Sequence, residues 1–187
     1  MTVNYTDIVK KYDFSSVIFQ DEIDQTCKIV KEIIDSGNYF ENSPKYQTKE
    51  NLFARKEAVW LKYRMSFMFA CFMYLGKEVN IKGINCWSFM TSHDANQDRY
   101  QLWHHHHYDL TTAKISGIMY LNIPKDIDTF DTSGTEFSIG HPEKDPTFFI
   151  KPEYFSWMIY PSNLWHRPGP CPSVQNRFVL AADMEYQ

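Results

Sequence analysis

Phe155-Ser-Trp-Met-Ile-Tyr-Pro-Ser-Asn-Leu-Trp-His166 leads into the turn Pro168-Gly-Pro-Cys-Pro172, and Arg177-Phe-Val-Leu-Ala-Ala-Asp-Met184 follows. Both flanking segments are rich in apolar and aromatic residues, which pack well on a pleated sheet. The prolines and the glycine between them favour a turn. We therefore predict strand-bearing segments over 155–166 and 177–184, joined by a tight, proline-rich connection.

Further strand candidates lie upstream and are separated by polar or turn-forming residues. They cover residues 81–90, 100–109, 115–123, 135–139 and 148–150, and the polar stretch 92–99 is predicted to be a loop. Short strands with frequent turns are typical of β-sandwiches and barrels. Periodicity alone does not distinguish a jelly roll from another sandwich.

The first 80 residues favour helices instead. Apolar residues recur at helical spacing over 21–36, and Gly37 follows as a helix C-cap. A second helix is predicted over 49–75, closed by Gly76. Its second half is apolar nearly all round, which indicates burial on several sides.

This order of elements predicts one α+β domain, mainly β, over 1–187. Residues 1–78 would form a mostly helical flank, and residues 79–187 a jelly-roll core that carries the site. The aromatic share of 17% also favours a β-rich interior.

Charge and cysteine content limit the setting and the partners. The net charge of -4 gives no general case for binding nucleic acid. The cysteines show no CxxC spacing, and the N-terminal residues lack a signal-peptide pattern. The longest apolar run, within the second predicted helix, is shorter than the roughly 20 residues that a membrane span needs. We therefore expect a reduced, cytoplasmic protein with no membrane partner.

The chemically most informative segment is Trp103-His104-His105-His106-His107-Tyr108-Asp109. On a strand, successive side chains point to opposite faces. His105, His107 and Asp109 would then share one face, and His104, His106 and Tyr108 the other.

His107 and Asp109 thus form an HxD pair whose imidazole and carboxylate can converge on one ion. His166, in Pro161-Ser-Asn-Leu-Trp-His166, is the predicted third ligand from a distant strand. Two histidines and one carboxylate leave several positions open on an octahedral metal, an arrangement typical of iron(II) oxygenases.

Arg177 comes 11 residues after His166, across the proline-rich turn. If that turn closes a hairpin, both side chains can face one cavity. A guanidinium there can hold a dicarboxylate through two parallel hydrogen bonds. Arg167 is a rival for this role, but strand alternation turns it away from the face of His166.

At these residues the chain resembles the 2-oxoglutarate- and iron(II)-dependent dioxygenases, especially the prolyl-hydroxylase-like and short phage-encoded branches. The resemblance rests on four motifs within residues 85–186: His107-Tyr-Asp109, Ile118-Met-Tyr-Leu-Asn122, Tyr160-Pro-Ser-Asn-Leu-Trp-His166 and Arg177-Phe-Val179. It implies a double-stranded β-helix, or jelly roll, with iron near its open mouth.

Residue by residue, the resemblance implies that His107, Asp109 and His166 bind Fe(II). Arg177 and Tyr120 would bind the far carboxylate of 2-oxoglutarate, although Tyr120 is equally well explained as a core aromatic. Many members have a serine where this chain has Val179. Some relatives carry HxH instead of HxD, so the pair His105/His107 is an alternative, with Asp109 then accepting a hydrogen bond from one imidazole.

The resemblance also implies the reaction. The enzyme would consume O2 and convert 2-oxoglutarate to succinate while it hydroxylates an unactivated C–H bond. The substrate would be a small molecule or a peptide side chain, which the sequence does not identify. Two other interpretations remain open: a non-catalytic, cupin-like jelly-roll module that binds a metal or ligand, and a zinc hydrolase of cupin-like shape.

Overall fold

The computed structural model describes residues 7–40, 46–91, 102–106, 112–125, 134–141, 147–169, 171, 173 and 175–187. Its elements are, in chain order, β1 (Lys10–Asp13), α1 (Gln20–Asp35), β2 (Tyr46–Gln47), the 3₁₀ helix η2 (Leu52–Ala54), α2 (Ala58–Leu75), β3 (Ile81–Thr91), β4 (Ala113–Asn122), β5 (Thr135–Ser138), β6 (Phe148–Ile150), β7 (Ser156–Pro161), β8 (Trp165–Pro168) and β9 (Arg177–Tyr186).

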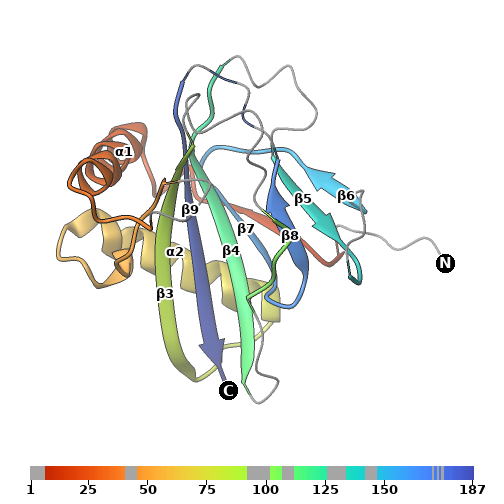
Figure 1. Ribbon diagram of the computed structural model, residues 1–187. Helices are drawn as coiled ribbons and strands as arrows, with labels where there is room; N and C mark the ends of the chain where they lie inside the picture. Colours follow the sequence, from red (N-terminus) through yellow and green to blue (C-terminus); the bar gives the residue numbers. More distant parts are fainter. Residues whose placement is uncertain are drawn as a thin grey trace.

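The strands of the described residues form two antiparallel sheets. A six-stranded sheet has the order β1-β7-β4-β9-β3-β2, and a three-stranded sheet has the order β6-β5-β8 (Figure 1). β9, at the C-terminal end, lies between β3 and β4 and pairs with both along most of its length. The predicted fold class is confirmed: a mainly β jelly roll preceded by helices.

The segment 155–166 divides between the two sheets. β7 ends at Pro161 and pairs with β4 in the large sheet, whereas β8 begins at Trp165 and pairs with β5 in the small sheet. The predicted hairpin that would make His166 and Arg177 neighbours in one sheet is therefore wrong. β8 and β9 lie in different sheets, and their side chains meet across the space between the sheets.

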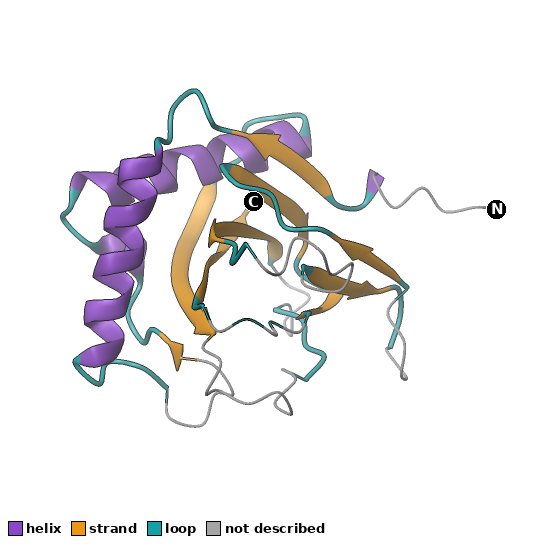
Figure 2. Cartoon of the chain, turned by 90° about the horizontal axis from the view of Figure 1, so that it is seen from above, coloured by secondary structure: helices purple, strands orange, loops and turns teal. Residues whose placement is uncertain are grey.

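Both α-helices cover the outer face of the large sheet. Figure 2 shows α1 and α2 on one side of the strands, away from the small sheet. Their inward side chains share one apolar core with outward-facing residues of the large sheet, including Trp60, Tyr63, Phe67, Met119, Trp157, Ile159 and Leu180. A buried polar contact within this layer is the hydrogen bond from Trp157 Nε1 to Ser66 Oγ, at 2.9 Å.

Gly117 allows α2 to approach the sheet closely. A Cβ atom at this position would lie 2.7 Å from Phe67 Cε2 and 2.8 Å from Ile159 Cδ1. The absence of a side chain in the middle of β4 is therefore required by the packing of the Phe67 ring, not by the local backbone.

The boundaries of α1 have local causes. Glu22, in the first turn, accepts a hydrogen bond from the backbone N–H of Phe19 at 3.0 Å, which satisfies one donor at the open helix start. Past the other end, Gly37 has a φ of +82°, a left-handed conformation that glycine adopts without steric cost.

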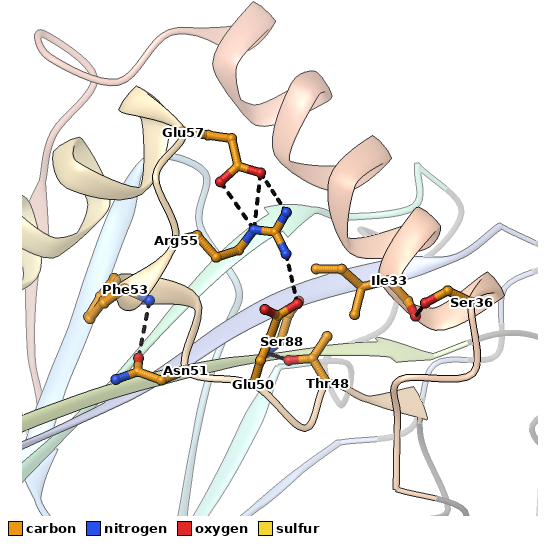
Figure 3. A network of polar contacts seen from close by, with 9 residues as sticks. All are labelled: Ile33, Ser36, Thr48, Glu50, Asn51, Phe53, Arg55, Glu57 and Ser88. Atoms are coloured by element: carbon orange, nitrogen blue, oxygen red, sulfur yellow. Dashed lines mark hydrogen bonds and ion pairs between the residues drawn. The ribbon is translucent and has the colours of Figure 1, made fainter.

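The single helix predicted over 49–75 is in fact two. Asn51 caps η2 by accepting from the Phe53 N–H, and the backbone is extended at Arg55 before α2 begins at Ala58. Figure 3 shows the polar contacts here, in which the Arg55 guanidinium bridges Glu50 and Glu57. These side chains stabilise the break between the two helices.

One face of α2 is not covered by the described residues, contrary to the expectation of burial on several sides. Its large apolar side chains recur every four residues and are about half exposed: Leu61, Met65, Phe69 and Met73. No helix in the described part of the chain is long and apolar enough to cross a membrane.

A second, smaller core fills the space between the sheets. Ile118, Tyr120, Met158, Tyr160 and Val179 contribute to it from the large sheet, and Phe137 from the small sheet. Because these side chains alternate with the outward-facing ones, β4, β7 and β9 each contribute to both cores. The candidate site opens into this inner layer.

Candidate metal centre and co-substrate pocket

A pocket lies between the two sheets. It is lined by Phe89, Thr91, His104, His106, Ile118, Tyr120, Thr135, Tyr160, His166, Pro168, Arg177, Val179 and Ala181. Its walls are thus mostly apolar, with imidazoles, hydroxyls and one guanidinium as the polar groups.

His104 and His166 are brought together by backbone pairing. The His104 N–H donates to the His166 carbonyl at 3.2 Å, and the His166 N–H donates to the His104 carbonyl at 2.9 Å. The segment 102–106 therefore runs antiparallel beside β8. The His106 N–H donates in turn to the carbonyl of Ser162, at 2.8 Å, which extends the attachment past β8.

The two paired histidines have the same tautomer. Nδ1 of His104 lies 3.0 Å from the Leu102 carbonyl oxygen, and Nδ1 of His166 lies 2.9 Å from the Leu164 carbonyl oxygen. A carbonyl can only accept, so each Nδ1 carries the proton. Nε2 of each ring then has its lone pair available for a metal.

His106 is oriented by a carboxylate. Its Nδ1 lies 2.9 Å from Asp183 Oδ1, so this ring also donates through Nδ1 and presents Nε2. Its ring centroid is 5.3 Å from that of His104 and 4.9 Å from that of His166.

His104, His106 and His166 each offer one nitrogen, and these ligand atoms all lie within 4.8 Å of one another. Neutral imidazoles with fixed tautomers suit a first-row transition metal such as Fe(II). The donor set therefore fits the metal that the sequence predicts. The described residues place three imidazoles at this point, where a two-histidine, one-carboxylate set was expected.

The environment of His166 keeps it in the ligating form. Burial, together with the neighbouring His104 and His106 rings, holds the pKa of His166 well below its usual value. His166 is 2% exposed, and its lowered pKa leaves the ring neutral near pH 7, so the lone pair of Nε2 stays available to a metal.

The other predicted ligands, His107 and Asp109, lie outside the described residues, and the HxD pair remains a prediction. The alternative pair His105/His107 also remains a prediction, but among the described residues the His105 ring lies outside the histidine cluster and packs edge-on against Trp165, with centroids 4.6 Å apart. Because the backbone of His104 pairs with that of His166, alternation turns His104 and His106 toward the pocket and His105 away from it.

A sequence signal for His104 was present. Leu102-Trp103-His104 and Leu164-Trp165-His166 are the same tripeptide. In both copies the histidine Nδ1 donates to the carbonyl of the leucine two residues earlier. The repeated tripeptide thus marks two histidines with the same local hydrogen bond, His104 in an isolated bridge and His166 in β8.

Arg177 and Tyr120, the predicted co-substrate residues, line the same pocket as His166. Arg177 is 1% exposed, and its Nη2 donates to the Gly169 carbonyl at 3.1 Å. Its guanidinium carbon lies 6.0 Å from the centroid of the Tyr120 ring. A buried cation beside a phenol can bind a carboxylate with charge-assisted hydrogen bonds.

Tyr120 has a partner that the sequence did not reveal. Its hydroxyl lies 2.8 Å from Thr135 Oγ1. Burial raises the pKa of Tyr120 although Arg177 opposes this shift, so the hydroxyl stays protonated and able to donate. Val179, where many relatives have serine, lines the pocket with an apolar side chain.

The rival anchor Arg167 is engaged elsewhere. It forms an ion pair with Glu136, directly opposite on β5, and its guanidinium lies 4.5 Å from the ring centroid of Trp103. Neither Arg167 nor Glu136 lines the pocket. Glu136 is buried, at 8% exposure, and the guanidinium that pairs with it packs against Trp103.

Solved structures share this architecture. A Pseudomonas putida prolyl-4-hydroxylase matches with a TM-score of 0.67 and 9% identity, over 98% of this chain and 96% of that one. A viral collagen prolyl hydroxylase from Paramecium Bursaria Chlorella virus-1, in a complex with 2-oxoglutarate, matches with a TM-score of 0.60 and 12% identity. The match covers 96% of this chain and 97% of that one. The carbocyclase SnoK from nogalamycin biosynthesis matches with a TM-score of 0.69 and 8% identity, over 97% of this chain and 81% of that one.

At these identities the likeness establishes the fold alone. No curated protein matches the sequence. A family profile described as "Putative 2OG-Fe(II) oxygenase" matches residues 85–183, which is more than half of the chain and includes the three clustered histidines and Arg177. The chain therefore belongs to the 2-oxoglutarate- and iron(II)-dependent oxygenases, whose cofactors are Fe(II), 2-oxoglutarate and O2.

Proposed function

We propose that the protein hydroxylates an unactivated C–H bond of a small molecule or a peptide side chain, with conversion of 2-oxoglutarate to succinate. The observation that carries this proposal is one pocket lined by both His104, His106 and His166 and the buried Arg177. A metal-binding module has no need of the guanidinium, whereas a dicarboxylate co-substrate does.

In this proposal His104, His106 and His166 hold the iron through Nε2, because each Nδ1 is committed to a hydrogen bond. The bound iron supplies the oxidative chemistry, and the protein supplies orientation and exclusion of water. Asp109, which the sequence predicts as a ligand together with His107 and His166, would then be a further ligand of this site.

Arg177 would bind the far carboxylate of 2-oxoglutarate, and Tyr120, which lines the same pocket, would assist through its hydroxyl. Ile118, Val179 and Ala181, which line the pocket, would provide apolar walls for the co-substrate. Because Arg177 is 1% exposed, the low local dielectric would strengthen its ion pair with the carboxylate.

The experiment is turnover of 2-oxoglutarate to succinate without added substrate, after anaerobic loading with Fe(II). His104→Ala, His106→Ala and His166→Ala should each abolish the turnover. The matched control is His105→Ala, which removes the ring that faces Trp165 and should leave turnover largely intact.

Two further variants separate the ligand sets. If Asp109→Ala or His107→Ala also abolishes turnover, those residues belong to the metal site as the sequence predicts. If wild-type protein binds Fe(II) but never consumes 2-oxoglutarate, the oxygenase proposal is wrong and the cupin-like binding module takes its place.

A further inference from the structure

Asp183 is an acidic side chain on the inward face of β9, and it contacts the histidine cluster directly. Its Oδ1 lies 2.9 Å from His106 Nδ1 and accepts a second hydrogen bond from Ser116 Oγ at 2.6 Å. The side chains of Asp183 and His106 are only 14% and 15% exposed. Neither the sequence motifs nor the co-substrate role of the pocket accounts for this carboxylate.

The carboxylate accepts from His106 and Ser116, and Ser162 in turn contacts Ser116. Ser116 comes from β4 and Ser162 from the turn after β7, and their Oγ atoms are 2.8 Å apart. Because the one hydroxyl proton of Ser116 goes to Asp183, Ser162 donates to Ser116. The Ser162 backbone carbonyl accepts a hydrogen bond from the backbone N–H of His106. The network therefore contacts both the backbone and the ring of this histidine.

His106 therefore differs from the other two imidazoles in one respect. His104 and His166 donate Nδ1–H to neutral carbonyls, whereas His106 donates to a carboxylate. A carboxylate partner makes the opposite nitrogen of an imidazole a stronger metal ligand. It also places a negative charge directly behind that ligand. Three neutral imidazoles bring no charge of their own to offset that of a divalent cation.

We propose that Asp183 is a positioning residue of the metal site: it holds His106 with Nε2 toward the metal and provides negative charge beside the three imidazoles. This inference rests on the proposed function, because it takes the three-histidine cluster as the iron site. Substitutions of such partners of ligands typically cost about 10- to 100-fold in metal affinity.

The test is anaerobic titration of the metal-free protein with Co(II), followed through its visible absorption, in Asp183→Asn and Asp183→Ala. The asparagine can still accept from Nδ1 but carries no charge, so Co(II) affinity should fall by roughly tenfold. The alanine loses both contributions, and affinity should fall toward roughly 100-fold. Nitrogen NMR of labelled histidine in the same metal-free variants should show Nδ1–H retained at residue 106 in the asparagine and no longer uniform in the alanine.

Glu185→Gln is the matched control. It removes the same charge two residues further along β9, where Glu185 pairs with Lys114 at 3.0 Å on the surface. Its Co(II) affinity should equal that of the wild type. Folded Asp183 variants that bind Co(II) as tightly as Glu185→Gln does would overturn the inference, and the near-isosteric asparagine keeps the test valid if the alanine does not fold.

A second arm separates this inference from the proposed function. If His104→Ala loses Co(II) binding while both Asp183 variants keep it, only the role of Asp183 is wrong. If His104→Ala binds Co(II) like the wild type, the three-histidine site itself is wrong, and the proposal for Asp183 is wrong with it.

Discussion

The Tyr120 hydroxyl lies 2.8 Å from Thr135 Oγ1, and this hydrogen bond joins the two sheets at the pocket that holds Arg177. Tyr120 comes from β4 of the large sheet and Thr135 from β5 of the small one. Both side chains are buried, at 2% and 1% exposure. Tyr120 is thus part of the inner core and also a polar group of the pocket.

Tyr120→Phe should therefore have two effects. It leaves the Thr135 hydroxyl buried without this partner, which costs about 1–3 kcal/mol in the free energy of unfolding. It also removes the phenol beside Arg177, so the Kd for 2-oxoglutarate should rise. Urea unfolding and a titration of the anaerobic, metal-loaded protein measure the two effects.

Thr135→Val is the companion variant, since it breaks the same hydrogen bond but keeps the phenol. If the phenol binds the co-substrate, Thr135→Val loses stability with a smaller rise in Kd than Tyr120→Phe. Equal and unchanged Kd values in both variants would make Tyr120 a core residue only.

Arg177→Lys should raise the KM for 2-oxoglutarate by roughly 10- to 100-fold, because a hydrogen bond to a charged group contributes about 1.5–3 kcal/mol. Lysine keeps the charge but lacks the planar pair of donors. Arg167→Lys is the control, because Arg167 pairs with Glu136 and lies outside the pocket. A larger effect at Arg167 than at Arg177 would reverse the assignment of the anchor.

Gly117→Ala should destabilise the fold by about 1–3 kcal/mol, as overpacking of a core does. The new Cβ would lie 2.7 Å from the Phe67 ring, so that ring or the helix must move. The thermal midpoint of the metal-free protein measures the loss.

Gly83→Ala makes the same chemical change on β3, where the nearest atom would be Glu185 Oε2 at 3.6 Å, and should cost little. Phe67→Leu should partly relieve Gly117→Ala, so that the two changes are not additive. Additive losses would show that the contact with Phe67 is not the cause.

Acid should weaken the attachment of α1 through Glu22. Burial by itself would raise the pKa of Glu22, but the ion pair with Lys62 and the hydrogen bond from the Phe19 N–H outweigh it and lower that pKa. A carboxyl group whose pKa is lower in the folded state stabilises the protein above its unfolded pKa, about 4.3. This contribution disappears as the pH falls through the folded pKa.

Urea unfolding of the metal-free protein between pH 7 and pH 3 measures this dependence. Glu22→Gln should be less stable than the wild type at pH 7, and the difference should shrink toward pH 3. Lys62→Met should reduce the pH dependence without removing it, because the Phe19 N–H still donates to Glu22. A difference between wild type and Glu22→Gln that stays constant over this range would contradict the role of Glu22.

Much of the architecture could be predicted from the sequence because it depends on local patterns. Alternating and aromatic segments predicted β5, β6 and β9 closely, and the helical repeat with Gly37 predicted α1. The same patterns did not predict the break at Arg55 before α2, which depends on the ion pairs of that side chain with Glu50 and Glu57.

The histidine run shows where local pattern ends. Alternation divides the four histidines into two pairs on opposite faces. Because all four residues are identical, the run itself does not indicate which pair faces the metal site. The backbone pairing of His104 with His166 makes that choice, and it forms only when β8 crosses to the small sheet. His107 and Asp109 remain predicted ligands outside the described residues.

From the sequence alone came the β-rich class, the family resemblance, and the expectation that His166, Arg177 and Tyr120 serve one site. Only the tertiary structure decided that His104 and His106 turn toward that site, that Asp183 stands behind His106, and that Thr135 meets Tyr120. The physical reason is that each of these contacts joins strands distant in sequence. Their register is set by backbone hydrogen bonds and core packing across the two sheets, which no local pattern encodes.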